Sequence, residues 1–101
     1  MLNRLNFQAE LEQLLGSEQV YFQSPGNVNM VYPAIVYNLS TVRADHADDI
    51  SYRNKIGYLV TLIDKNPSSV HFVSLLEFRH SQFDRFFRSD KLNHFVFTIY
   101  F

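Results

Sequence analysis

The clearest strand pattern in this sequence is ISYRNKIGYLVTLI, at residues 50–63. Apolar and polar residues alternate along it, and the residues of one face are Tyr52, Ile56, Tyr58, Val60 and Leu62. The other face is polar at first and becomes apolar only at Leu59 and Ile63. This pattern predicts a strand with one wet side at its start and with both sides covered at its end.

The residues before this strand predict a hairpin. A second alternating run occupies residues 32–42, and Pro33 lies at its start, where the N–H that proline lacks is not needed for pairing. The polar residues 43–49 separate the two runs and are typical of an exposed hairpin tip. We therefore expect a long two-stranded arm whose tip projects from the domain while its other end packs under a helix.

The flanking sequence predicts five further elements. Residues 3–15 form an amphipathic pattern with helical spacing, and Val70, Val73 and Leu76 mark a second, shorter helix. The remaining predicted elements are strands at 20–23, 78–88 and 94–101. The order is then α-β-β-β-α-β-β, an α+β fold with a mostly antiparallel sheet and helices packed on one face. We expect residues 1–101 to form a single domain.

Composition excludes several classes of protein. Nine Lys and Arg balance ten Asp and Glu, for a formal net charge of −1, which argues against a non-specific nucleic-acid binder. The chain has no cysteine, so disulfides, zinc–thiolate sites and cysteine nucleophiles are excluded. No apolar run approaches the ~18 residues of a membrane span, and the start of the chain does not resemble a signal peptide. We expect a soluble protein made in a cytoplasm.

Aromatic residues are unusually frequent. The chain has ten Phe and six Tyr, and nine of these sixteen lie between Phe72 and Phe101. Two interpretations stay open, which are a Phe-rich core and an aromatic contact with another chain. Within this region, residues 79–91 also interleave basic and aromatic side chains, but acidic residues intersperse them. That alternation favours a strand with one wet face over a nucleic-acid site.

The acidic tip raises the question of a metal-dependent enzyme. Asp45, His46, Asp48 and Asp49 are potential metal ligands, but their spacing matches no metal motif, and a solvated tip explains them equally. The histidines lie in no catalytic signature, and we expect that the side chain of His94 hydrogen-bonds within its turn. We therefore predict no catalytic residue, no metal and no cofactor, with the metal-dependent enzyme kept as the alternative of a different class.

Three segments together resemble a family of short tailed-phage proteins, the tail completion, tail terminator or minor capsid proteins. The segments are Val20-Tyr-Phe-Gln23 with Met30-x-Tyr-Pro-x-Ile-Val-Tyr37, Val60-Thr-Leu-Ile-Asp-x-Asn-Pro-x-Ser69, and Phe83-Asp-Arg85 with Asp90-x-Leu-Asn-His-x-x-Phe-Thr-x-Tyr100. Together they cover most of the chain in unbroken order. The sequence departs from the family at Ser24, where proline is usual, and at Phe95, where an acidic residue is common.

The resemblance implies an assembly protein of the virion. Such a protein forms a ring, six-fold in this family, that caps the tail tube and joins it to the head connector. Its partners would be its own copies, the tail tube protein and the head connector or head-closure protein, with no membrane and with DNA only passing through the lumen. It would occur in the tail or neck of the virion, and in the host cytoplasm during assembly.

The residues expected at subunit or partner contacts belong to the hairpin tip and the C-terminus. They are Arg43, Asp45, His46, Asp48, Asp49, Ile50, Tyr52 and Phe101. We expect Phe101 to contribute mainly to assembly, because a terminal carboxylate must stay hydrated or paired. The alternatives among non-enzymes are a head-closure or adaptor ring on the connector side and a binding module that is not part of a virion.

Overall fold

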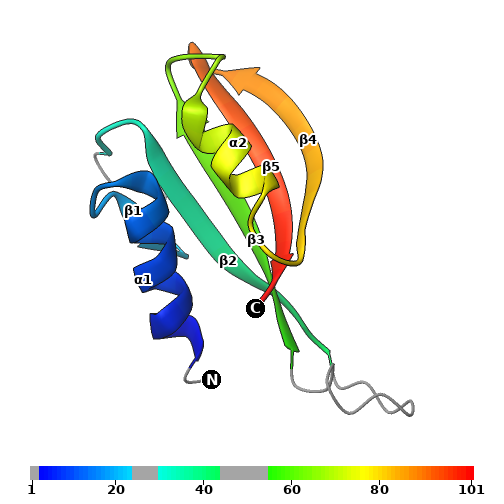
Figure 1. The fold of residues 1–101 in the computed structure, drawn as a ribbon. Helices are drawn as coiled ribbons and strands as arrows, with labels where there is room; N and C mark the ends of the chain where they lie inside the picture. Colours follow the sequence, from blue (N-terminus) through cyan, green and yellow to red (C-terminus); the bar gives the residue numbers. More distant parts are fainter. Residues whose placement is uncertain (1–2, 24–29, 44–54) are drawn as a thin grey trace.

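The computed structural model describes residues 3–23, 30–43 and 55–101 (Figure 1). Two helices and five strands follow one another in the predicted order, α-β-β-β-α-β-β, so the α+β fold is confirmed. Their bounds are α1 (Asn3–Leu15), β1 (Val20–Phe22), β2 (Ala34–Arg43), β3 (Lys55–Asp64), α2 (Val70–Leu76), β4 (Ser81–Ser89) and β5 (Leu92–Tyr100).

The five strands form one mixed sheet with the order β1-β2-β3-β5-β4. Three of its four pairings are antiparallel, as expected, but β1 runs parallel to β2. Parallel neighbours need a long connection that carries the chain back before it pairs, and the residues between Phe22 and Ala34 provide it. The two edges of the sheet are therefore unlike, since one is the three-residue β1 and the other is the nine-residue β4.

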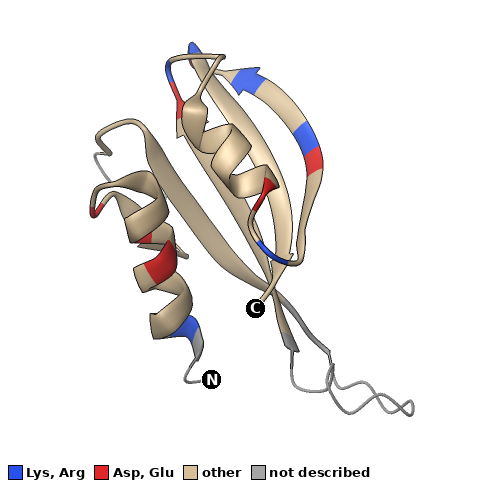
Figure 2. Cartoon of the chain, in the orientation of Figure 1, with Lys and Arg blue, Asp and Glu red and all other residues tan. Residues whose placement is uncertain are grey.

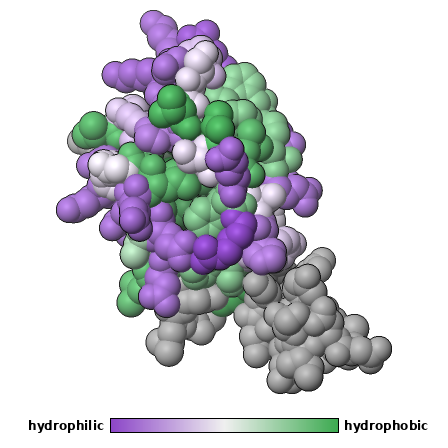
Figure 3. Space-filling model, in the orientation of Figure 1, coloured by the Kyte–Doolittle hydropathy of each residue, from purple (hydrophilic) through white to green (hydrophobic). Residues whose placement is uncertain are grey.

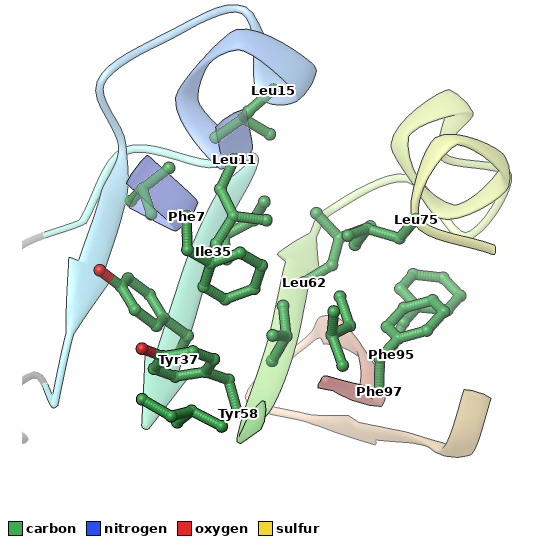
Figure 4. Close-up of a cluster of buried hydrophobic side chains, with 14 residues drawn as sticks. Phe7, Leu11, Leu15, Ile35, Tyr37, Tyr58, Leu62, Leu75, Phe95 and Phe97 are labelled. Atoms are coloured by element: carbon green, nitrogen blue, oxygen red, sulfur yellow. The ribbon is translucent and has the colours of Figure 1, made fainter. Parts of the chain in front are cut away.

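Both helices lie on the same side of the sheet, as the sequence predicts (Figure 1). The core forms between them and the sheet, and the fully buried Phe7 and Leu11 of α1 face Ile35, Tyr37 and further strand residues there (Figure 4). The ring of Phe7 stacks on Tyr58 with centroids 4.6 Å apart and meets Tyr37 edge-on at 5.5 Å. Much of the aromatic content is thus a Phe- and Tyr-rich core.

Strand β3 has the faces that its sequence predicts. Tyr58, Val60 and Leu62 are fully buried under the helices. On the opposite side Leu59 is half-buried and Ile63 is buried, which agrees with the expected change toward the end of the strand. The predicted strand residues 50–54 lie outside the described part of the chain, so the projecting tip remains a prediction.

The strand predicted at residues 78–88 begins later, at Ser81. The reason is a pair of turns after α2, because the Phe78 N–H donates to the Leu75 carbonyl and the Ser81 N–H donates to the Phe78 carbonyl. His80 adopts a left-handed φ of 58° there, which no strand residue does. Phe78 is consequently a core-packing residue and not the start of a strand.

The short helix α2 is correctly predicted, but the residues that mark it are not its buried face. Ser69 caps it, accepting a hydrogen bond from the His71 N–H at 3.3 Å. The fully buried residue is Leu75, whereas Val70, Val73 and Leu76 are exposed. This helix therefore has apolar residues on two faces, and only one of them packs on the sheet.

Candidate functional site

The predicted contact residues of the hairpin tip lie mostly outside the described residues. Arg43 ends β2, and its backbone pairs with Lys55 at the start of β3. The structure thus fixes where the intervening segment is attached, at one end of the β2–β3 ladder. The other predicted tip residues fall within residues 44–54, outside the described part, and are Asp45, His46, Asp48, Asp49, Ile50 and Tyr52.

Phe101 packs against residues of its own chain. Its ring centroid lies 4.9 Å from that of Phe7, and its N–H donates to the Ile56 carbonyl at 3.0 Å. The Arg79 guanidinium lies over the same ring, 5.1 Å from its centroid, and also pairs with Glu10 at 2.9 Å. Because the ring is only half-buried, a role in assembly stays a prediction, but Phe101 also contributes to the core of the monomer.

Most of the exposed large apolar side chains among the described residues belong to α2 and β4, and we give the name α2–β4 surface to five of them. It consists of Val70, Val73, Leu76, Phe83 and Phe86. Val70 is 73% exposed, Val73 52% and Phe86 49%, which are high values for such side chains. Figure 3 shows hydrophobic atoms gathered over α2 and beside β4 on this face. Large exposed apolar patches on small proteins mark interaction sites.

The sheet itself holds the two aromatic members of this surface in place. Phe83 meets Phe72 of α2 with centroids 5.2 Å apart, and Phe86 lies 5.1 Å from Phe95 of β5. A register shift between Phe83 and Arg85 brings Phe83 and Phe86 to the same face although they are three residues apart. Alternation in the sequence does not reveal this bulge, so the sequence does not predict that Phe83 and Phe86 share a face.

Strand β4 is also an open edge. Within the described residues it pairs only with β5, which leaves its outer N–H and C=O groups available to another strand. Two arginines flank this edge, and Figure 2 shows both as blue bands along β4. Arg88 shares the helix side with Phe86, while Arg85 lies on the other side, its guanidinium 5.7 Å from the Phe87 ring centroid.

Arg85 and Arg88 form no ion pair with the carboxylates of the described residues. Among residues 3–23, 30–43 and 55–101, no Asp or Glu oxygen lies within 4 Å of Arg85 or Arg88. Asp84, which precedes Arg85 in the sequence, accepts a hydrogen bond of 2.6 Å from the Thr98 hydroxyl. The α2–β4 surface therefore combines apolar side chains, an unpaired backbone edge and two unpaired cations.

A polar cluster beneath α1 is structural. The Tyr37 hydroxyl donates to Gln8 Oε1 at 2.6 Å and accepts from Arg4 at 3.5 Å. Desolvation by burial raises the pKa of Tyr37, against the lowering effect of the Arg4 hydrogen bond and charge, and burial likewise raises the pKa of Tyr58. Both phenols are consequently neutral around pH 7, as hydrogen-bonded core residues are.

The described histidines do not form a catalytic arrangement. His94 Nδ1 faces the Leu92 carbonyl at 3.2 Å, which confirms the expected contact within its turn, and its ring stacks on Phe87. No group of three or more His, Asp or Glu able to hold a metal occurs in the part of the chain that the structure describes. The acidic residues 45–49 lie outside that part, so the predicted absence of a metal there stays a prediction.

Comparison with protein-family models, curated proteins and solved structures finds no match for this chain. Among the described residues, no helix has the length and apolar character needed to cross a membrane.

Proposed function

We propose that this chain is a structural protein of a tailed-phage neck, a ring-forming tail terminator. In this role a ring of subunits caps the last ring of the tail tube, stops its growth and then binds the head connector. DNA passes through the lumen without being read. The mechanism is complementarity between protein surfaces, and it requires no catalytic residue and no cofactor.

The exposed α2–β4 surface is the observation that carries this proposal. A head-to-tail ring needs two different, complementary patches on one chain. The sheet has unlike edges, with β4 open beside an apolar patch and β1 short and next to α1. A subunit of this shape suits a repeated contact in which one edge meets a different part of the next copy.

The family resemblance supports the same function. Its segments lie in β1, in β2, at the end of β3 with the following turn, in β4 and in β5, so they extend across all five strands of the sheet. The departure at Phe95 is accommodated inside the subunit, because this ring packs against Phe72 and Phe86. The motifs thus correspond to one continuous part of the fold rather than to scattered surface residues.

Removal of the gene from the phage genome that encodes it tests the proposal. Loss of a tail terminator leaves tube growth unchecked, so we expect overlong tubes and heads without attached tails in electron micrographs. Complementation by the wild-type chain should restore tails of one length. Tails of normal length beside heads that leak DNA would instead assign the chain to the head-closure ring.

A further inference from the structure

The α2–β4 surface has features that define the chemistry of what it binds. Its apolar part is formed by Val73, Phe83 and their neighbours, and its edge presents the unpaired N–H and C=O groups of β4. An extended segment can add to such an edge through main-chain hydrogen bonds and place alternate side chains on the apolar patch. The surface therefore suits an extended segment with apolar residues at alternate positions.

The charges of this edge indicate which segment can bind there. Arg85 and Arg88 lie on opposite faces of the edge strand and Lys91 follows in the β4–β5 turn, so these three cations outnumber Asp84 and Asp90 of the same stretch. The complementary ligand is acidic, because opposite charges steer two surfaces together and like charges oppose their contact. The chain itself contains such a segment in residues 44–54, with three aspartates against one arginine and with Ile50 and Tyr52 two residues apart.

Within its own chain, this segment cannot reach the Arg88 end of the surface. Residues 44–54 are anchored where Arg43 pairs with Lys55, and from there an extended chain spans at most about 20 Å to its middle. Arg88 lies at the opposite end of the sheet, because it pairs with Asn93, which pairs with Asp64. The ten residues of β3, Lys55 to Asp64, correspond to about 30 Å of strand from the first Cα to the last. The segment that binds there must come from a second copy.

We propose that the α2–β4 surface of one copy binds residues 44–54 of a second copy, which adds as an extended strand along β4. Asp48 and Asp49 then lie near Arg85 and Arg88, and Ile50 and Tyr52 cover Phe83 and Phe86. The contact is heterologous, so each copy both receives a segment and supplies one. This inference rests on the self-association in the proposed function and names the surfaces that perform it.

Charge reversal in the full-length chain tests the pairing. One variant carries Arg85→Glu with Arg88→Glu, and a second carries Asp48→Lys with Asp49→Lys. Sedimentation velocity should show that each alone dissociates, with a dissociation constant raised at least about tenfold, because like charges now meet. An equimolar mixture should assemble like the wild type, since each variant then offers the other a complementary contact. Thermal unfolding of each variant confirms that the substitutions leave the fold intact.

A control variant with charges added at another surface tests whether the effect is specific to this contact. Gln13→Glu with Ser17→Glu adds negative charge to exposed positions near the opposite edge and should leave assembly unchanged. The inference is overturned if the mixture stays dissociated, if only one of the two variants loses assembly, if neither does, or if the wild type remains monomeric at every concentration. The tube-length phenotype is read separately, so assembly through another surface leaves the proposed function standing.

Discussion

At the scale of single residues, depth of burial determines which aromatic rings stabilise the monomer. Phe97 is fully buried in the middle of β5, and its ring centroid lies 5.3 Å from that of Phe83. Phe101 is half-buried directly after the same strand, and its ring packs against that of Phe7. Both rings therefore pack in the monomer, and they differ in how deeply they are buried. This modifies the expectation from the sequence that Phe101 contributes mainly to assembly.

Truncating these two rings should give graded losses of stability. Phe97→Ala should lower the free energy of unfolding by about 3–5 kcal/mol, the usual cost of removing a buried Phe. Phe101→Ala should cost about 1–2 kcal/mol, because only part of its ring leaves apolar surroundings. Denaturant unfolding of both variants measures the difference, and equal losses would show that Phe101 is as enclosed as Phe97.

Because the phenol of Tyr37 is buried in its neutral form, we expect the free energy of unfolding to decrease at alkaline pH. Burial raises its pKa above the ordinary value near 10, so the folded state holds this proton more tightly than the unfolded state. Its contribution is fully present below the unfolded pKa and is lost as pH rises through the folded pKa. Tyr37→Phe should therefore weaken the decline in stability above about pH 10. An unchanged alkaline slope in the denaturation curves would contradict this.

At the scale of elements, the two faces of α2 make opposite contributions. Leu75 points into the core, whereas Val73 on the outer face is half exposed to solvent. Helical spacing in the sequence identifies the element, yet five of its seven residues are apolar, so the spacing does not reveal which of them are buried. The outer face of α2 is therefore apolar although it is exposed to solvent.

Paired substitutions in α2 should separate folding from assembly. Leu75→Ala should cost about 2–5 kcal/mol, as for a buried leucine. Val73→Ser should change the monomer's stability by no more than about 0.5 kcal/mol, because an exposed site has little packing to lose. Thermal unfolding at low concentration checks both values, and a large loss for Val73→Ser would place that residue in the core.

Most of the fold follows from local patterns, and the exceptions have physical causes. Alternation along residues 55–63 and helical spacing in residues 3–15 predict their elements because each buries one regular face. The parallel pairing of β1 is decided by only three residues and a long connection, which leave no periodic signal. The α2–β4 surface depends on a bulge in β4, so it emerges only once β4 and β5 are paired.

At the scale of the whole molecule, the competing enzyme hypothesis predicts a response to metal ions. If residues 45–49 are only a solvated tip, added Mg²⁺, Ca²⁺ or Zn²⁺ should leave the Tm unchanged in the wild type. A bound metal at 100 times its Kd would stabilise the native state by about 2.7 kcal/mol. A rise of several degrees that disappears in Asp45→Asn with Asp49→Asn would favour the metal site.

The central claim is that copies of this chain associate head to tail into a closed ring. Native mass spectrometry of the purified full-length chain, with electron microscopy of the same sample, measures the number of copies and the closure directly. We expect one predominant species with a fixed copy number and ring-shaped particles, since a heterologous contact that closes gives a single size. A chain that is monomeric at all concentrations, or that forms open filaments without a fixed size, would contradict the account.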